Sequence, residues 1–155
     1  MKFKYLFILA LMIFLEACGA YGKRFTNLDL VEDKKGVLYI YRPTRLLHGG
    51  TWPTINIDGQ KVGSLKNGGY LVKEISPGKH VVEITGNIFI GGWMHRSFEV
   101  PIDIDAGEYS FLRIWLGGAE LHGTPGMYSV LADVHVKEVP KEVALKELSE
   151  VRLSD

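Results

Sequence analysis

The chain has almost no cysteine: Cys18 is the only one among its 155 residues. A single cysteine can form no intrachain disulfide. A domain that follows it has no cysteine nucleophile and no cysteine-based metal site. Stability must therefore come from apolar burial and backbone hydrogen bonding.

An excess of charge of one sign is also missing. The chain carries 18 basic and 18 acidic side chains, for a formal net charge of zero. Domains that bind nucleic acids usually show a basic excess gathered on one face. We therefore predict no nucleic-acid partner.

Long hydrophobic runs are absent as well, because the longest, Tyr5–Leu15, has only about 11 residues. A transmembrane helix needs about 20 apolar residues. Lys2 and Lys4 precede the run, and a positive start before an apolar stretch of this length is typical of a secretory signal. Residues 1–17 are predicted to be a leader and not a spanning helix.

The end of the leader allows two interpretations. Leu15-Glu16-Ala17-Cys18 resembles the lipobox of bacterial lipoproteins, which implies a diacylglycerol on the Cys18 thiol and an acyl chain on its amine. Glu16 departs from that pattern, in which this position is small or apolar. In the alternative, an ordinary signal peptidase cuts after the small-x-small triplet Cys18-Gly19-Ala20. We favour lipidation of Cys18, because a lone cysteine rarely ends an apolar leader by coincidence.

The location expected from this leader is the bacterial envelope. Gly19, where sorting signals for the inner membrane have Asp, resembles lipoproteins carried to the outer membrane. We therefore expect a chain held by its N-terminal lipid at the outer membrane and facing the periplasm. Polar residues 18–35 are predicted to be the anchor and a tether, and residues 36–155 a single domain.

The domain is rich in short apolar and β-branched runs that end at Gly, Pro or Asp. About eight such runs at regular spacing indicate an all-β fold, either a β-sandwich or a partly closed antiparallel barrel. The expected strands cover residues 37–42, 53–57, 61–65, 70–75, 80–85, 96–105, 108–116 and 127–136.

Three local features sharpen this prediction. Asp58-Gly59 between two extended runs predicts a tight hairpin, because both central residues need positive φ. Pro101 within a strand predicts an edge position or the outward side of the ladder, since proline cannot donate to a ladder. Pro140 is followed by the only convincing helical pattern, which predicts one C-terminal helix over residues 141–153.

The first half of the domain resembles a known family. Tyr39-Ile-Tyr-Arg-Pro43, Ile55-Asn-Ile-Asp-Gly59, Asn67-Gly-Gly-Tyr70 and Pro77-Gly-Lys-His80 resemble the bacterial lipoproteins known as domain of unknown function 2846. A weaker likeness exists to PEGA-type β-domains. The resemblance implies an exported or lipid-anchored domain without established activity, and it supplies no catalytic residues.

Histidines give the only metal hypothesis. His48, His95 and His122 lie in glycine-rich loops that could meet at one end of a sandwich, whereas His135 could share a strand face with Asp133. None has the spacing of a zinc site. Gly-x-Ser-x-Gly and phosphate-binding glycine patterns are also absent, so we predict neither a metal site nor a cofactor.

Aromatic residues and one arginine are the candidate ligand-binding set. Trp52, Trp93, Trp115 and Arg42 could bind a glycan or a partner, and Tyr39, Tyr41 and Phe111 could add stacking surface. The same residues equally fill sandwich cores or pair at sheet ends. Exposed, clustered tryptophans would favour a ligand-binding domain, and buried ones would not.

Three functions remain in competition. The preferred one is a non-enzymatic binding or accessory lipoprotein of the envelope, with an envelope protein or glycan as partner. The second is a small-ligand or glycan-binding β-domain. The third is a metal-dependent enzyme that uses the loop histidines.

Overall fold

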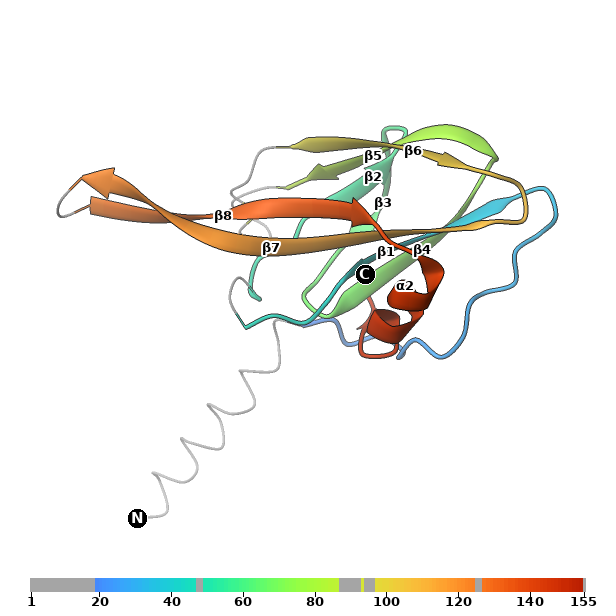
Figure 1. Ribbon diagram of the computed structural model, residues 1–155, viewed down its shortest axis with the longest axis horizontal. Helices are drawn as coiled ribbons and strands as arrows, with labels where there is room; N and C mark the ends of the chain where they lie inside the picture. Colours follow the sequence, from blue (N-terminus) through green and yellow to red (C-terminus); the bar gives the residue numbers. More distant parts are fainter. Residues whose placement is uncertain (1–18, 47–48, 87–92, 94–96, 125–126, 155) are drawn as a thin grey trace, which may run out of the picture.

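The computed structural model describes residues 19–46, 49–86, 93, 97–124 and 127–154, with residues 118–133 described by their backbone only. These residues form two sheets and one helix, which confirms the all-β prediction (Figure 1). The elements are β1 (Gly36–Arg42), β2 (Thr54–Ile57), β3 (Gln60–Ser64), β4 (Gly69–Ile75), β5 (Gly78–Thr85), β6 (Phe98–Ile104), β7 (Tyr109–Thr124), β8 (Met127–Glu138), α2 (Lys141–Leu148) and β9 (Arg152–Leu153).

The two sheets make a sandwich and not a closed barrel. One sheet has the order β8-β7-β1-β4-β9, and the other has the order β3-β2-β5-β6. The smaller sheet is antiparallel throughout. The larger sheet is mixed, because β1 pairs with β7 and β4 with β9 in parallel.

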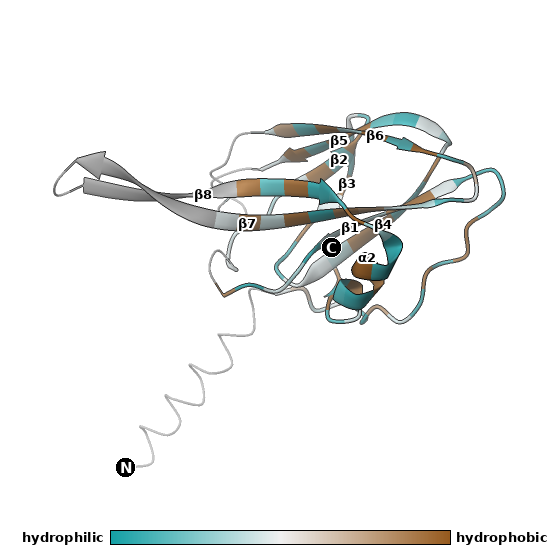
Figure 2. Cartoon of the chain, in the orientation of Figure 1, coloured by the Kyte–Doolittle hydropathy of each residue, from teal (hydrophilic) through white to brown (hydrophobic). Residues whose placement is uncertain are grey.

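Strand periodicity explains the core between the sheets. Alternate residues point to opposite faces of a strand, and Leu38 and Ile40 of β1 face Ile55 and Ile84 of the smaller sheet in one buried cluster. Colours alternate between apolar and polar along β6 and along residues 134–138 of β8, as this arrangement requires (Figure 2). The expected period-two strands are thereby confirmed.

The other face of the larger sheet carries a second core. Val37, Tyr39 and Tyr41 of β1 pack there with Ala144 and Leu148 of α2. Every residue of β1 is therefore buried, because each of its two faces is covered. The molecule has three layers: the smaller sheet, the larger sheet, and α2 with the N-terminal segment.

Two turn and edge predictions are confirmed. Asp58 and Gly59 adopt φ values of 50° and 76° between β2 and β3. Pro101 lies on β6, an edge strand of the smaller sheet, opposite Val81 of β5.

The C-terminal helix is shorter than expected, and its predicted extent was wrong. It ends at Leu148, and residues 152–153 form β9 instead of another helical turn. The Arg152 backbone N–H donates to the Gly68 carbonyl over 2.9 Å, while Val151 is buried in the second core. Pairing with β4 supplies backbone partners that a sequence pattern does not reveal.

Residues 19–25, expected to belong to a tether, lie along the C-terminal segment. Ala20 donates its N–H to the Asn67 carbonyl over 3.0 Å, and Leu153 donates to the Lys23 carbonyl over 2.8 Å. Phe25 enters the second core and packs edge-on against Tyr39 and Tyr70. This stretch is thus part of the folded layer beneath the larger sheet.

Candidate functional site

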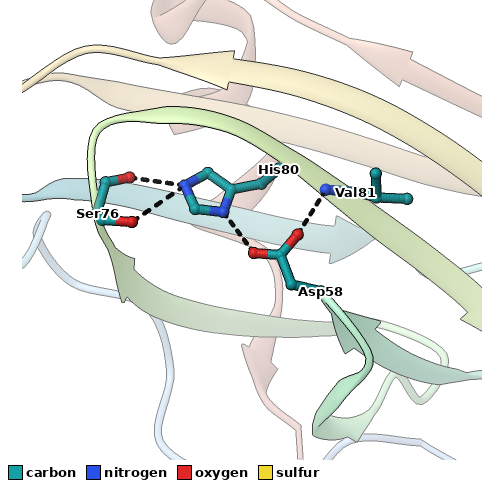
Figure 3. A network of polar contacts seen from close by, with 4 residues as sticks. All are labelled: Asp58, Ser76, His80 and Val81. Atoms are coloured by element: carbon teal, nitrogen blue, oxygen red, sulfur yellow. Dashed lines mark hydrogen bonds and ion pairs between the residues drawn. The ribbon is translucent and has the colours of Figure 1, made fainter.

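Three polar residues meet at one end of the sandwich. Asp58 lies in the β2–β3 turn, Ser76 in the β4–β5 turn, and His80 near the start of β5 (Figure 3). The pairing of Ile57 with Val82 brings the two turns together. Residue types that serve in hydrolases are thereby brought into contact.

Hydrogen bonds fix the imidazole from both sides. His80 Nδ1 lies 2.6 Å from Asp58 Oδ2, and His80 Nε2 lies 2.7 Å from the Ser76 carbonyl oxygen. The other Asp58 oxygen accepts the Val81 N–H over 2.9 Å. Each ring nitrogen thus faces an acceptor, and the doubly protonated ring satisfies both.

The charge state follows from these contacts. The hydrogen bond to Asp58 raises the pKa of His80 above its usual 6.5, and the Ser76 carbonyl acts in the same direction. The hydrogen bond from His80 lowers the pKa of the Asp58 carboxyl below 3.8. The pair therefore favours an imidazolium facing a carboxylate.

This geometry does not suit nucleophilic catalysis. A catalytic histidine must accept the serine proton at Nε2. Here Nε2 donates to the Ser76 carbonyl, and the Ser76 hydroxyl lies farther away at 3.5 Å. The three residues form a clamp between two turns, which we call the turn clamp.

A hollow beside the turn clamp is small. It measures about 210 Å³, and its lining includes Lys61, Lys73 and Glu74. Binding sites for small organic ligands usually enclose about 300–1,000 Å³. The hollow suits water or an ion better than a sugar or cofactor.

Trp93 and Arg42 belong to the interior. Trp93 is 1% exposed and packs in the core between the sheets, so it presents no ring face to a glycan. Arg42 is also 1% exposed, and its guanidinium donates to the Thr51 carbonyl. Burial lowers the pKa of Arg42 to about 10, so it stays charged at neutral pH while it holds the loop after β1.

Trp52 and Trp115 are only half-buried. The Trp115 ring stacks on His135 with centroids 4.9 Å apart, and the Arg113 guanidinium lies 5.0 Å from the Trp115 ring centroid. Cation–π and ring stacking of this kind stabilise neighbouring strands without a ligand. The stacking on His135 joins β7 to β8, and the Arg113 contact lies within β7.

The remaining aromatic candidates face α2. Tyr39, Tyr41 and Phe111 are buried in the second core. The Tyr41 hydroxyl donates to Glu147 over 2.5 Å, and burial is the main reason that its pKa is raised. Burial likewise raises the pKa of Tyr39 to about 12. These rings fix the helix layer and offer no stacking surface.

Several other predicted site residues lie outside the residues, or the side chains, that the structure describes. Cys18, His48 and His95 lie outside the described residues, as do the side chains of His122 and Asp133. In the part of the chain that is described, no group of three or more His, Cys, Asp or Glu side chains could hold a metal ion. Nor does a described helix have the length and apolar character needed to span a bilayer.

Sequence reasoning missed the turn clamp. Asp58-Gly59 was predicted as a turn, and Pro77-Gly78 has the composition of another. Their contact depends on β2 pairing with β5, which is not consecutive in the chain. The available signal for the turn clamp was the position of His80, which follows a Pro-Gly turn and precedes the buried Val82 by two residues.

The fold is a β-sandwich domain in which one sheet is mixed and one helix packs on the outer face of that sheet. Its polar clusters connect turns and layers to one another. The chain matches the family model of the protein of unknown function (DUF2846) over residues 32–126, more than half its length, and it belongs to that family. No curated protein and no solved structure matched. The likeness to PEGA-type domains is not shown by these comparisons.

Proposed function

We propose that the protein is an exported envelope lipoprotein, anchored by lipid on Cys18, that serves as a non-enzymatic binding or accessory module. The observation that carries this proposal is the order Lys2, Lys4, an apolar run to Leu15, and then Cys18 as the only cysteine. Several acyl chains on one residue give stable attachment, whereas a single chain binds only marginally. The proposed location is the periplasmic face of the outer membrane.

The contacts of the domain support a non-enzymatic role. Nε2 of His80 is occupied by a backbone carbonyl. Trp93 and Arg42 are buried in structural positions. Of the residues predicted to bind a ligand, Trp52 and Trp115 are the two that stay half-buried, so the weight of a glycan-binding function would fall on them.

The proposal is tested at Cys18. The parent expressed in a Gram-negative host should yield a mature N-terminus at Cys18 that carries acyl chains, measured by mass spectrometry of the purified chain. Cys18→Ala should lose the acyl mass and leave the membrane fraction or accumulate unprocessed.

Glu16→Ala is the matched variant for the processing step. It restores a small residue at the position where this leader departs from the lipobox pattern, so it should be processed at least as fast as the parent. A parent N-terminus at Tyr21 without acyl mass would contradict the proposal and support ordinary signal peptidase cleavage.

A further inference from the structure

The first described residue lies at a definite place on the domain. Gly19 bridges Asn67 in parallel, and Gly22 donates to the Leu153 carbonyl over 3.2 Å. A Cβ on Gly22 would fall 2.4 Å from the Leu153 oxygen, so the two segments are in close contact. Cys18 is therefore joined directly to a fixed backbone.

Asn67 also holds the loop that follows β1. Its side-chain oxygen accepts the Arg45 N–H over 2.9 Å, and its amide donates to the Arg45 carbonyl over 2.8 Å. Leu46, the next residue, is fully exposed. The start of the described chain and this loop thus lie at the same end of the domain (Figure 1).

Tyr21 and Lys66 complete this end. Tyr21 is 68% exposed. The Lys66 ammonium lies 4.2 Å from the centre of its ring and 3.1 Å from its hydroxyl. Tyrosine and lysine are side chains that settle at the boundary between lipid and water.

The charge of this end contrasts with the neutral chain. The four segments that meet there carry five of the 18 basic residues and none of the 18 acidic ones, although Glu150 and Asp155 adjoin them in sequence. The segments are residues 19–25, 43–46, 64–70 and 151–154, and the basic residues are Lys23, Arg24, Arg45, Lys66 and Arg152. We call this end the basal face.

We propose that the basal face rests on an anionic phospholipid surface. This inference builds on the proposed function, because the acylated residue would be Cys18. Consecutive Cα atoms are about 3.8 Å apart, and each headgroup layer is about 5–7 Å thick. A lipid on Cys18 therefore holds Gly19 within the headgroups. Basic side chains around it meet anionic lipid, while Leu46 and Tyr21 reach the interface.

The absence of other cysteines permits a clean test. The Cys18 thiol is blocked if acylated, and Cys18 is removed if cleavage occurs after Ala20, so an introduced cysteine is the only free thiol in either mature chain. Leu46→Cys carries an environment-sensitive fluorophore on the basal face. Val81→Cys carries it on β5 as the control, since Val81 is 36% exposed. Mature protein is mixed with vesicles that contain phosphatidylglycerol and a lipid-borne quencher.

The label at position 46 should be quenched and the label at position 81 should not. Arg45→Gln with Lys66→Gln should lower the ratio of docked to undocked protein about 25-fold, at roughly fivefold for each basic residue near an anionic surface. Lys61→Gln with Lys79→Gln changes the net charge equally at the opposite end of the sandwich and should have no such effect. Vesicles of phosphatidylcholine alone should dock the parent less than phosphatidylglycerol vesicles dock the double variant, because they attract none of the five basic residues.

Two results would overturn the inference: equal quenching at the two positions, or quenching that the basal substitutions leave unchanged. If the label at position 46 were shielded from solvent in native envelopes but not in vesicles, the basal face would be assigned to a protein partner instead. The mass of the mature N-terminus is measured on the same samples. Loss of the acyl mass would remove the proposed anchor, while the vesicle readout would still decide whether the basal face binds lipid.

Discussion

At the scale of single residues, His80 shows how a reactive side chain can serve structure. Its two nitrogens face a carboxylate and a carbonyl, so the ring joins two turns that are separate in sequence. Protonation strengthens both contacts, because each nitrogen then has a proton to donate. The clamp is thus sensitive to pH.

The sign of that sensitivity follows from the raised pKa of His80. A group whose pKa is higher in the folded state stabilises that state fully below its unfolded pKa, and the contribution is lost as pH rises through the folded pKa. The midpoint of thermal unfolding should therefore fall as pH rises above about 6.5. His80→Gln should lower the midpoint at pH 6 and flatten this slope.

Ser76→Ala is the control for that experiment. It removes the hydroxyl 3.5 Å from Nε2 but keeps the carbonyl that accepts the stronger hydrogen bond. The pH slope should therefore persist. An unchanged slope in His80→Gln would show that another group is responsible.

At the scale of elements, α2 is held by its buried face and by two polar contacts of Glu147. Ala144 and Leu148 are fully buried, whereas Val143 is 43% exposed. Glu147 accepts from Tyr41 and lies 3.3 Å from the Arg113 guanidinium, which ties the helix to β1 and β7. A helix of eight residues would not be stable alone, so packing must hold it.

Leu148→Ala should therefore destabilise the whole domain. Truncation of a fully buried leucine costs about 2–5 kcal/mol through lost transfer energy and the cavity left behind. Urea unfolding of the purified protein measures the change. Val143→Ala on the exposed side should stay within about 0.5 kcal/mol of the parent. Similar losses in both variants would place the buried face elsewhere.

At the scale of the whole molecule, the two ends of the described chain complete one layer. Phe25 N donates to the Val151 carbonyl over 3.3 Å, and Ser154 accepts from the Lys66 N–H over 2.8 Å. β9 then extends the larger sheet beside β4. Meanwhile β7 and β8 run on together beyond the other strands as a long hairpin (Figure 1).

Phe25→Ala should loosen this layer. The Phe25 ring lies 5.9 Å from Tyr39 and 5.7 Å from Tyr70, centre to centre, and its loss should cost about 3 kcal/mol or more. Amide hydrogen exchange should speed up in residues 19–25 and 151–154 more than in β1. Leu30→Ala, at a position that is 91% exposed, should leave exchange unchanged. Uniform acceleration across the domain would contradict a local role.

The sequence was informative wherever local chemistry decides the structure. Period-two residues such as Leu112 and Ile114 marked the inner face, and Asp58-Gly59 marked a turn. It failed where distant segments supply the partners. Residues 19–25 have their backbone partners at Asn67 and in residues 151–153, and nothing in their own polar composition distinguishes them from a tether.

The candidate site, too, was predictable only where local chemistry decides the structure. Trp93 follows the Gly91-Gly92 pair, and the sequence left open whether its ring is exposed or buried. It is buried because its ring packs over Gly86, at which an added Cβ would lie 2.4 Å from the Trp93 Cβ. Only the fold reveals that contact, which leaves the Trp93 ring with no exposed face for a ligand.

The pairing of residues 22–25 with residues 151–153 has a consequence for the order of events during folding of the proposed exported chain. A chain made and exported from its N-terminus delivers the first segment long before the last. On the proposed route of export, residues 22–25 cannot find their backbone partners until the final residues have crossed the membrane. The segment beside the proposed anchor would therefore stay unpaired with the C-terminal segment during translocation, and the domain would close against it only when export is complete.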